Sequence, residues 1–173
     1  HGKITGIPQI LLNSSPVSRG PWRLKALIDH QGRSVTSSFI VIRPKRRKWS
    51  LEVLWAILNS PLANAYIYCH GTKRLIGVTR ILSLPIPDMN ENDSSSLSKL
   101  VQDYFKIFCQ KREFLQSEID TKEAKQKMLA IDAEVMRLYN LPPKLERQVL
   151  DLFDGWQRNG VDFKFERYFP KDF

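Results

Sequence analysis

Two apolar stripes with helical spacing fill much of the second half of the chain. In the first stripe, apolar side chains recur with i, i+3, i+4 spacing from Leu97 to Phe108. In the second, they recur at steps of four and three from Ala124 to Leu138. Such spacing places the apolar side chains on one face of a helix. Two consecutive helices with matching faces are expected to pack as an antiparallel hairpin.

The first half of the chain has the pattern of a small sheet. Residues 8–13 form a short apolar run, and residues 35–42 are rich in β-branched side chains. Residues 22–29 alternate loosely between apolar and basic side chains. These patterns predict three strands. The Asp29–Gly32 turn between the last two is typical of a hairpin, so we expect these two strands to pair with each other.

A helical segment broken at Ser60-Pro61 follows the strands. Ser50 is a suitable N-cap for a first helix, and Ser60 followed by proline indicates a second N-cap. Residues 75–87 then carry two apolar runs that end in Pro-Ile-Pro. We expect this stretch to be a mostly buried strand.

These elements predict an α/β fold of the α+β kind, with a small mixed sheet followed by a helical hairpin and a short C-terminal helix. The polar stretch Asp88–Ser96 indicates a boundary. We therefore expect a recognition domain at residues 1–92, a helical spacer at 93–140 and a C-terminal helix with an extended tail at 141–173. The last helix is expected to begin at Pro143.

Positive charge is confined to the first half of the chain. Residues 1–92 hold thirteen Lys and Arg against four Asp and Glu, an excess of nine, whereas residues 93–173 hold fourteen of each. A half-chain this basic favours a polyanionic partner. An acidic protein partner, or a surface that only aids solubility, is the alternative. The basic residues at loop positions are the candidates for DNA contacts, namely Arg19, Arg23, Arg43, Lys45, Arg46, Arg47, Lys48, Lys73, Arg74 and Arg80.

Motifs for catalysis, metal binding or cofactor binding are absent from the sequence. The three histidines are scattered, and there is no phosphate-binding glycine loop and no nucleophile elbow. Cys69 and Cys109 are too few for a metal site, and we expect both to be buried, reduced thiols. Reduced thiols fit a reducing, cytoplasmic setting, so a cytoplasmic location is expected. No apolar run is long enough to span a membrane, and no secretory leader is expected. The chain begins at His1 and is expected to be part of a longer protein.

Four motifs in a fixed order resemble a known family. They are Phe-Ile-Val-Ile-Arg-Pro at 39–44, Leu-Asn-Ser-Pro-Leu-Ala-Asn-Ala-Tyr at 58–66, Gly-Thr-Lys-Arg at 71–74 and Leu-Pro-Ile-Pro at 84–87. This order resembles the target recognition domains of Type I restriction-modification specificity subunits, which also occur at the C-terminal end of N6-adenine-specific DNA methyltransferases. The resemblance covers roughly residues 8–120. A specificity subunit has two such domains, and this chain has one.

The resemblance implies a module that recognises a sequence in double-stranded DNA. It adds Thr72 of the Gly-Thr loop to the residues expected to contact DNA. It also implies that the helical spacer docks on a DNA methyltransferase or nuclease module, in the same chain or a separate one. The methyltransferase catalytic tetrapeptide is missing, so no catalytic residue and no cofactor are expected here, although the parent protein could be a methyltransferase.

A protein-interaction module is the alternative function. In that case the apolar face of the first long helix docks a partner, and the basic half is incidental. The residues expected to make this contact, in either reading, are Leu97, Val101, Tyr104, Phe105 and Phe108.

Overall fold

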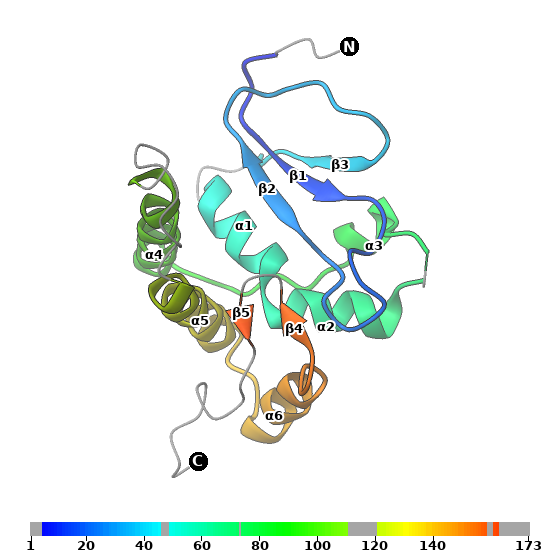
Figure 1. The fold of residues 1–173 in the computed structure, drawn as a ribbon, viewed down its shortest axis with the longest axis vertical. Helices are drawn as coiled ribbons and strands as arrows, with labels where there is room; N and C mark the ends of the chain where they lie inside the picture. Colours follow the sequence, from blue (N-terminus) through cyan, green and yellow to red (C-terminus); the bar gives the residue numbers. More distant parts are fainter. Residues whose placement is uncertain (1–4, 46–48, 73, 111–120, 159–160, 163–173) are drawn as a thin grey trace.

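The computed structural model of the chain describes residues 5–45, 49–72, 74–110, 121–158 and 161–162. A small antiparallel sheet lies against short helices, and a pair of long helices stands to one side (Figure 1). The α/β class expected from the sequence is confirmed. The sheet was expected to be mixed, which is wrong, because its described strand pairs are all antiparallel.

Three strands form the sheet, and the first strand in the sequence lies in the middle. β1 (Gln9–Asn13), β2 (Ala26–Asp29) and β3 (Phe39–Ile42) are ordered β2-β1-β3, and both pairs are antiparallel. The expected hairpin between the second and third strands is therefore wrong, because each pairs with β1 instead. Ile10 and Leu12 of β1 are fully buried. The central position gives this strand, the most buried of the three, hydrogen-bonding partners on both edges.

The predicted helix break at Ser60-Pro61 is confirmed. α1 (Leu51–Asn59) begins after Ser50, whose Oγ accepts a hydrogen bond from the backbone N of Val53 at 3.2 Å. α2 (Pro61–His70) begins after Ser60, whose Oγ accepts from the backbone N of Ala63 at 3.3 Å. Each serine satisfies a donor that the first helical turn leaves without a partner.

The buried strand expected at residues 75–87 is wrong. The structure has a single short helix there, α3 (Val78–Leu82), and none of its residues is buried. Only Ile76, Leu84 and Pro87 of this stretch are buried. Most side chains of this apolar run face solvent and not the interior.

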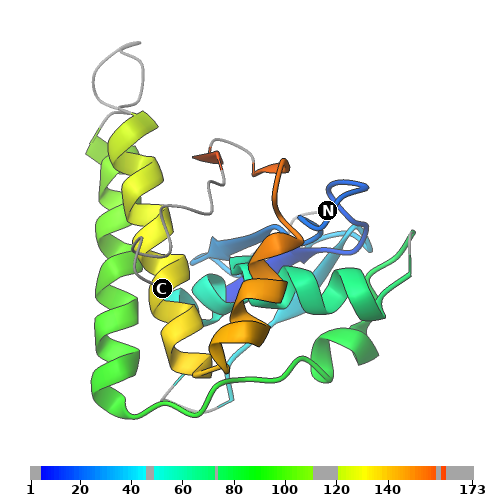
Figure 2. The ribbon, with the colours of Figure 1, turned by 90° about the horizontal axis from the view of Figure 1, so that it is seen from below.

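The helical hairpin is confirmed over the part of the chain that the structure describes. α4 (Glu91–Gln110) and α5 (Thr121–Tyr139) lie side by side and run in opposite directions (Figure 2). α4 packs on α1, and this contact connects the long hairpin to the part of the fold that contains the sheet. The N-cap predicted at Asp120 lies outside the described residues.

α4 begins within the polar stretch that was interpreted as a boundary. The Oδ1 of Asn90 accepts from the backbone N of Asp93 at 2.9 Å, and Asp93 Oδ2 accepts from the backbone N of Asn90 at 3.3 Å. This reciprocal pair caps the helix in the manner of a capping box. Met89, just before it, is buried, so the connection into α4 is short and anchored.

The C-terminal part of the described chain packs beneath α2. α6 (Pro143–Asp151) begins at Pro143, as expected, and contacts α2. A short hairpin follows, made of β4 (Gln157–Arg158) and β5 (Val161–Asp162). The Arg158 guanidinium donates to Asp132 Oδ2 at 2.6 Å, which fixes β4 to α5.

One hydrophobic cluster joins the sheet, the short helices and the long hairpin. It contains Ile10 of β1, Val53 of α1, Val101 of α4 and Ile131 of α5, each at most 1 % exposed. A second cluster centres on Phe153 and connects α2 with α6. The main core therefore extends across residue 92, where a domain boundary was expected.

Candidate nucleic-acid interface

Two buried asparagines at the α1–α2 corner hold the backbone that leads into β2. The Oδ1 of Asn64 accepts from the backbone N of Arg23 at 2.7 Å and of Leu24 at 2.8 Å. Asn59 pairs with Ala26 in both directions, accepting at 3.0 Å and donating at 3.2 Å. The Leu-Asn-Ser-Pro-Leu-Ala-Asn stretch thus has a structural role that its sequence pattern did not reveal: it positions the loop before β2.

The Gly-Thr-Lys-Arg loop is shaped by its first two residues. A Cβ on Gly71 would lie 2.4 Å from the carbonyl oxygen of Ile67, so a side chain there would collide with the end of α2. The Thr72 Oγ1 donates to the carbonyl oxygen of Leu75 at 2.9 Å and accepts from its backbone N at 3.2 Å. The hydroxyl of Thr72 is therefore committed to closing the loop.

Loop 71–77 abuts the loop that follows β1. The backbone N of Ile76 donates to the carbonyl oxygen of Ser14 at 2.8 Å. In the same region the Arg23 guanidinium lies 5.0 Å from the ring centroid of Tyr68 and donates to the carbonyl oxygen of Arg19 at 3.1 Å. Arg23 is only 7 % exposed. The expectation that Arg23 contacts DNA is therefore corrected, because its side chain is used to hold the Arg19 loop.

A hollow of about 450 Å³ opens between this loop and α3, and apolar atoms make up most of its exposed surface. We call it the polar hollow after the hydroxyl and arginine side chains that line it. Hydroxyl groups and one arginine supply most of its hydrogen-bonding atoms, and none of the described residues that line it is acidic. The Tyr66 hydroxyl donates to the Oγ of Ser83 at 3.1 Å, which links α2 to the residue after α3. The polar side chains of the hollow are His70, Thr72, Thr79, Arg80 and Ser83.

An apolar groove of about 360 Å³ lies on the other side of α3, between that helix and β3. Val41, Val78, Leu82 and Ile86 line it, and each is at least 40 % exposed. Arg43 is the only charged residue among the described residues of its lining. α3 is therefore a ridge with a polar hollow on one flank and an apolar groove on the other.

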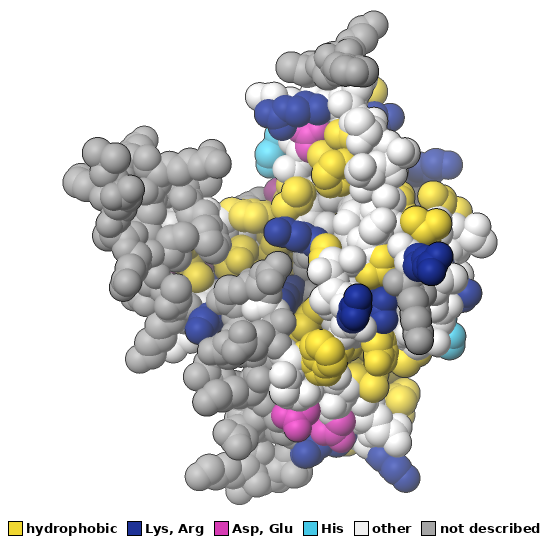
Figure 3. Space-filling model, turned by 45° about the vertical axis from the view of Figure 1, so that its right-hand side comes forward, with side chains coloured by type: hydrophobic (Ala, Val, Ile, Leu, Met, Phe, Trp, Pro, Cys, Tyr) yellow, Lys and Arg dark blue, Asp and Glu magenta, His cyan; other side chains and the backbone are white. Residues whose placement is uncertain are grey.

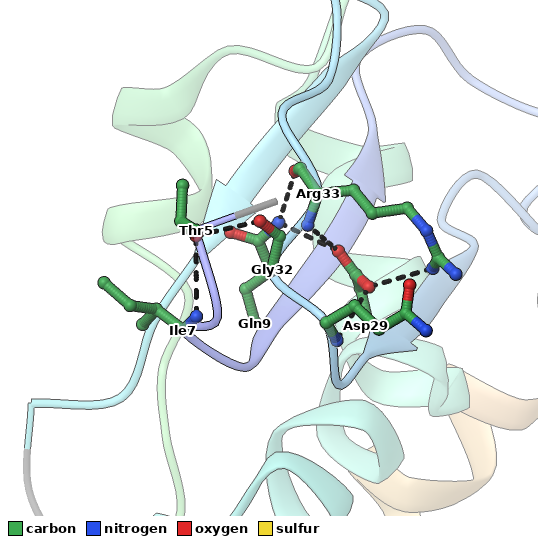
Figure 4. A network of polar contacts seen from close by, with 7 residues as sticks. Thr5, Ile7, Gln9, Asp29, Gly32 and Arg33 are labelled. Atoms are coloured by element: carbon green, nitrogen blue, oxygen red, sulfur yellow. Dashed lines mark hydrogen bonds and ion pairs between the residues drawn. The ribbon is translucent and has the colours of Figure 1, made fainter. Parts of the chain in front are cut away.

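A polar network at the opposite end of β1 positions Arg43. The Gln9 Oε1 accepts from the Nε of Arg43 at 3.2 Å and from its Nη2 at 2.8 Å. The Nε2 of Gln9 donates to Asp29 Oδ2 at 3.0 Å, and Asp29 Oδ1 pairs with the Arg33 guanidinium at 3.0 Å. Figure 4 shows Gln9, Asp29 and Arg33 converging between the strand and the 30–38 loop. Gln9 thus links a buried carboxylate to an exposed cation.

Asp29 stays ionised in this network. Burial alone raises the pKa of its carboxyl group, but hydrogen bonds from the Arg33 backbone, the Gln9 side chain and the Gln31 backbone lower the pKa more. The net result is a pKa below the usual range. Because this carboxylate is buried and paired, it does not offset the positive charge presented to solvent by Arg43.

The exposed cations among the predicted DNA contacts form two groups at opposite ends of β1. Arg19, Arg74 and Arg80 belong to the end near loop 71–77, and Arg43 and Lys45 follow β3 at the other end. The four residue-to-residue steps of β1, at about 3.3 Å each, place the two ends of the strand about 13 Å apart. Lys and Arg side chains are spread over the face shown in Figure 3, while Asp and Glu lie toward its upper and lower ends.

The remaining predicted DNA contacts are distributed as follows. The side chains of Arg19, Arg43, Lys45, Arg74 and Arg80 are exposed, as a contact with DNA requires. Thr72 is exposed but its hydroxyl closes the loop, as described above. The residues that lie outside the described part of the chain are Arg46, Arg47, Lys48 and Lys73.

The docking surface predicted on α4 is corrected in part. Leu97 and Val101 are fully buried against α1 and α5, so they belong to the core of this chain and offer nothing to a partner. Tyr104 and Phe105 are half-buried and pack around Trp55, at ring-centroid distances of 5.6 Å and 4.9 Å. The side chain of Phe108 lies outside the described residues.

An apolar cleft that the sequence did not indicate lies beside these aromatic residues. It has a volume of about 350 Å³ and lies between β2, α1 and the long hairpin. Tyr104 and Phe105 line it together with residues from distant parts of the sequence, including Trp22, Leu27, Met128 and Arg158. Because these positions meet only in the folded chain, no local motif could have predicted the cleft.

The remaining expectations concern the two cysteines, metal binding and membrane crossing. Cys69 is exposed, which corrects its predicted burial. The side chain of Cys109 lies outside the described residues. Within the described ranges, no three His, Cys, Asp or Glu side chains are grouped so that they could hold a metal ion. No described helix combines the length and apolar character needed to cross a membrane.

Comparisons with protein-family models, curated proteins and solved structures give no significant match to this chain. The function is therefore argued from the residues of the chain and from the order of its sequence motifs.

Proposed function

We propose that the chain is a sequence-specific DNA recognition module of a cytoplasmic restriction-modification system, of the kind associated with adenine methylation. The motif order along residues 39–87 supports this family assignment. In this proposal the chain holds duplex DNA and contributes no catalytic residue or cofactor. The methyl transfer or cleavage is carried out by a methyltransferase or nuclease module outside these residues.

The observation that carries the proposal is the charge around α3. β3, α3 and the two hollows beside α3 form one surface, which we call the candidate face. Exposed cations lie at both ends of this face. No acidic residue lines either hollow within the described residues. The one buried carboxylate nearby, Asp29, is neutralised by Arg33. A surface with cations at its rim and no opposing carboxylates attracts a polyanion over a long range.

The length of β1 is comparable with the width of a DNA groove. The backbone ends of β1, near which the two basic groups lie, are about 13 Å apart, and the major groove of B-form DNA is about 12 Å wide. Cations at the two ends of the face can therefore meet phosphates on the two borders of one groove. Phosphate contacts of this kind fix the register of a protein on DNA and supply most of its affinity.

The structure removes part of the α4 surface on which the protein-interaction alternative depends. Its proposed contact surface on α4 included Leu97 and Val101, and both are enclosed in the core. The half-buried aromatic residues Tyr104 and Phe105, which line the apolar cleft, are what favours this alternative. In the DNA-binding proposal the same cleft is available for docking the catalytic module.

Charge reversal tests the proposal. Lys45 and Arg74 are exposed and lie at opposite ends of the face. The double variant Lys45→Glu/Arg74→Glu should weaken binding to duplex DNA at least about tenfold at about 0.1 M salt, and should reduce the slope of log Kobs against log[salt] by roughly 2. Fluorescence anisotropy with a labelled duplex measures both quantities.

A matched variant controls for total charge. Lys99→Glu/Lys144→Glu makes the same change in net charge on exposed positions of α4 and α6, away from the candidate face. Its DNA affinity should stay within about threefold of the parent chain, because exposed charges beyond a Debye length of about 10 Å are screened. Equal losses in both double variants would show that only net charge matters and would refute the proposed face.

A further inference from the structure

α3 is the most prominent exposed element of the candidate face. Its flanks differ in chemistry, because Thr79 and Arg80 face the polar hollow while Val78 and Leu82 face the apolar groove. Leu82 is 80 % exposed and Val78 is 55 % exposed. These two side chains are four residues apart, so they lie on the same side of the helix.

The fold does not account for the apolar side chains of α3. Ile76 and Leu84 are each 5 % exposed and anchor the two ends of the segment in the core. Between these anchors only Ile81 is even half-buried. Val78 and Leu82 therefore contribute little to stability, and with Val41 and Ile86 they form a continuous exposed apolar groove. Such groups of exposed apolar residues mark binding surfaces more often than isolated ones do.

Arg80 on the polar flank is available to a ligand. Among the described residues, none forms a hydrogen bond or ion pair with its guanidinium group, and its side chain is exposed at the rim of the polar hollow. The backbone around it is fixed, because the Oγ of Ser83 donates to the carbonyl oxygen of Arg80 at 3.0 Å. An arginine on a fixed backbone with a free guanidinium group is suited to forming two parallel hydrogen bonds.

We propose that α3 is the element that reads base pairs in the major groove, with Arg80 contacting a guanine and Leu82 contacting the methyl group of a nearby thymine. This inference rests on the proposed function and deepens it. A helix is about 10–12 Å wide, and the major groove admits one. Arginine pairs with the O6 and N7 acceptors of guanine, and apolar side chains distinguish thymine by its C5-methyl group.

The charged residues beside α3 favour DNA over a protein as the partner that docks on this helix. The only charged residues that line the two hollows, within the described residues, are Arg80 and Arg43, with His70 beside them. A protein surface docking on the apolar groove would need to be acidic at both ends and apolar between. A DNA major groove presents phosphates at both borders and thymine methyl groups inside.

Selection from a randomised duplex library tests the inference. The parent chain, Arg80→Ala and Leu82→Ala are each used to enrich binding sites, and the enriched sequences are compared. The parent chain should enrich a site that contains a guanine and a thymine. Arg80→Ala should lose about tenfold discrimination at the guanine position alone, and Leu82→Ala should lose discrimination at the thymine position alone.

Two variants on α6 serve as controls. Arg147→Ala and Leu145→Ala make the same changes at exposed positions away from the candidate face, and both should enrich the parent site unchanged. Because Arg80 and Leu82 are also exposed, their truncation should leave the unfolding midpoint nearly unchanged.

The outcomes separate this inference from the proposed function. If the parent chain enriches a site and both α3 variants enrich the same site with the same preferences, the inference is refuted and DNA recognition by another element stands. In that case the apolar groove serves another contact, such as a protein surface. If the parent chain binds no duplex at all, both the proposed function and the inference fall.

Discussion

At the scale of single residues, the polar side chains that matter most for the fold are amides. Asn64 is fully buried, and its one carbonyl oxygen satisfies two backbone N–H groups before β2. Its own Nδ2 donates to the carbonyl oxygen of Ser60 at 2.9 Å. A buried N–H without a partner is costly, so this one side chain holds the Arg23 loop against α2.

Replacing Asn64 with alanine should therefore be strongly destabilising. The change leaves the N–H groups of Arg23 and Leu24 without their acceptor, and each unsatisfied group costs about 1–3 kcal/mol. We expect Asn64→Ala to lower the free energy of unfolding by about 2–4 kcal/mol, measured by urea denaturation. Gln102→Ala removes an exposed amide from α4 and should change it by less than about 0.5 kcal/mol. Similar values for the two variants would contradict the role of Asn64.

Asp29 should make stability depend on pH in the acid range. Its pKa in the folded chain is below the unfolded value, which is near 3.8. A lowered pKa means that the stabilising interaction is fully present above the unfolded pKa and is lost as the pH falls through the folded pKa. The stability difference between the parent chain and Asp29→Asn should therefore shrink as the pH is lowered from 6 to about 3.

The measurement for Asp29 is the urea midpoint at each pH. Asp154→Asn removes an exposed carboxylate at the end of the α6 region and provides a charge-matched control. Its urea midpoints should run parallel to those of the parent chain across the same pH range. A difference between the parent chain and Asp29→Asn that is constant with pH would show that Asp29 is not the titrating group.

At the scale of elements, local signals predicted the helices better than the strand pairing. The caps at Ser50 and Ser60 and the stripes of α4 and α5 depend on residues close in sequence, so the sequence indicated them directly. The order β2-β1-β3 depends on which strand is most deeply buried, which is a property of the whole core. The predicted turn at Asp29–Gly32 leads into a longer loop, and it does not join β2 and β3 as a hairpin.

The long hairpin of α4 and α5 should be required for residues 1–92 to fold. Val101 of α4 and Ile131 of α5 belong to the same cluster as Ile10 and Val53. A chain ending at residue 92 would expose the surface of α1 that α4 covers. Each Å² of apolar surface exposed in this way lowers the free energy of unfolding by about 25 cal/mol. We expect residues 1–92 alone to show no cooperative thermal unfolding by circular dichroism. A cooperative transition in this fragment would support an independent domain there.

The sequence predicted which residues could contact DNA, and the structure shows which of them are exposed. Charge location and motif order led to these candidates, because both are properties of sequence alone. The buried position of Arg23, the committed hydroxyl of Thr72 and the exposed flank of α3 could not be predicted, because each depends on contacts between segments far apart in the chain. The apolar run of residues 75–87 has the composition of a core strand, and only the three-dimensional arrangement shows that two anchors hold an exposed helix.

At the scale of the whole molecule, the chain is a basic face supported by a nearly neutral helical scaffold. The excess positive charge lies in residues 1–92, and the two long helices are stabilised partly by their own ion pairs. Arg137 of α5 bridges Glu134 at 2.7 Å and Asp93 of α4 at 2.8 Å. Among the described residues, Arg19, Lys45, Arg74 and Arg80 of the face form no ion pair within the chain, whereas Arg137 of the scaffold forms two.

The salt dependence of duplex binding tests the central claim most directly. The dissociation constant of the whole chain for a duplex is measured from about 50 to 200 mM salt, and log Kobs is plotted against log[salt]. If the exposed cations Arg19, Arg43, Lys45 and Arg74 each contact one phosphate, the slope should be about −3.6 or steeper. A slope near zero, or no binding at the lowest salt concentration, would contradict the account.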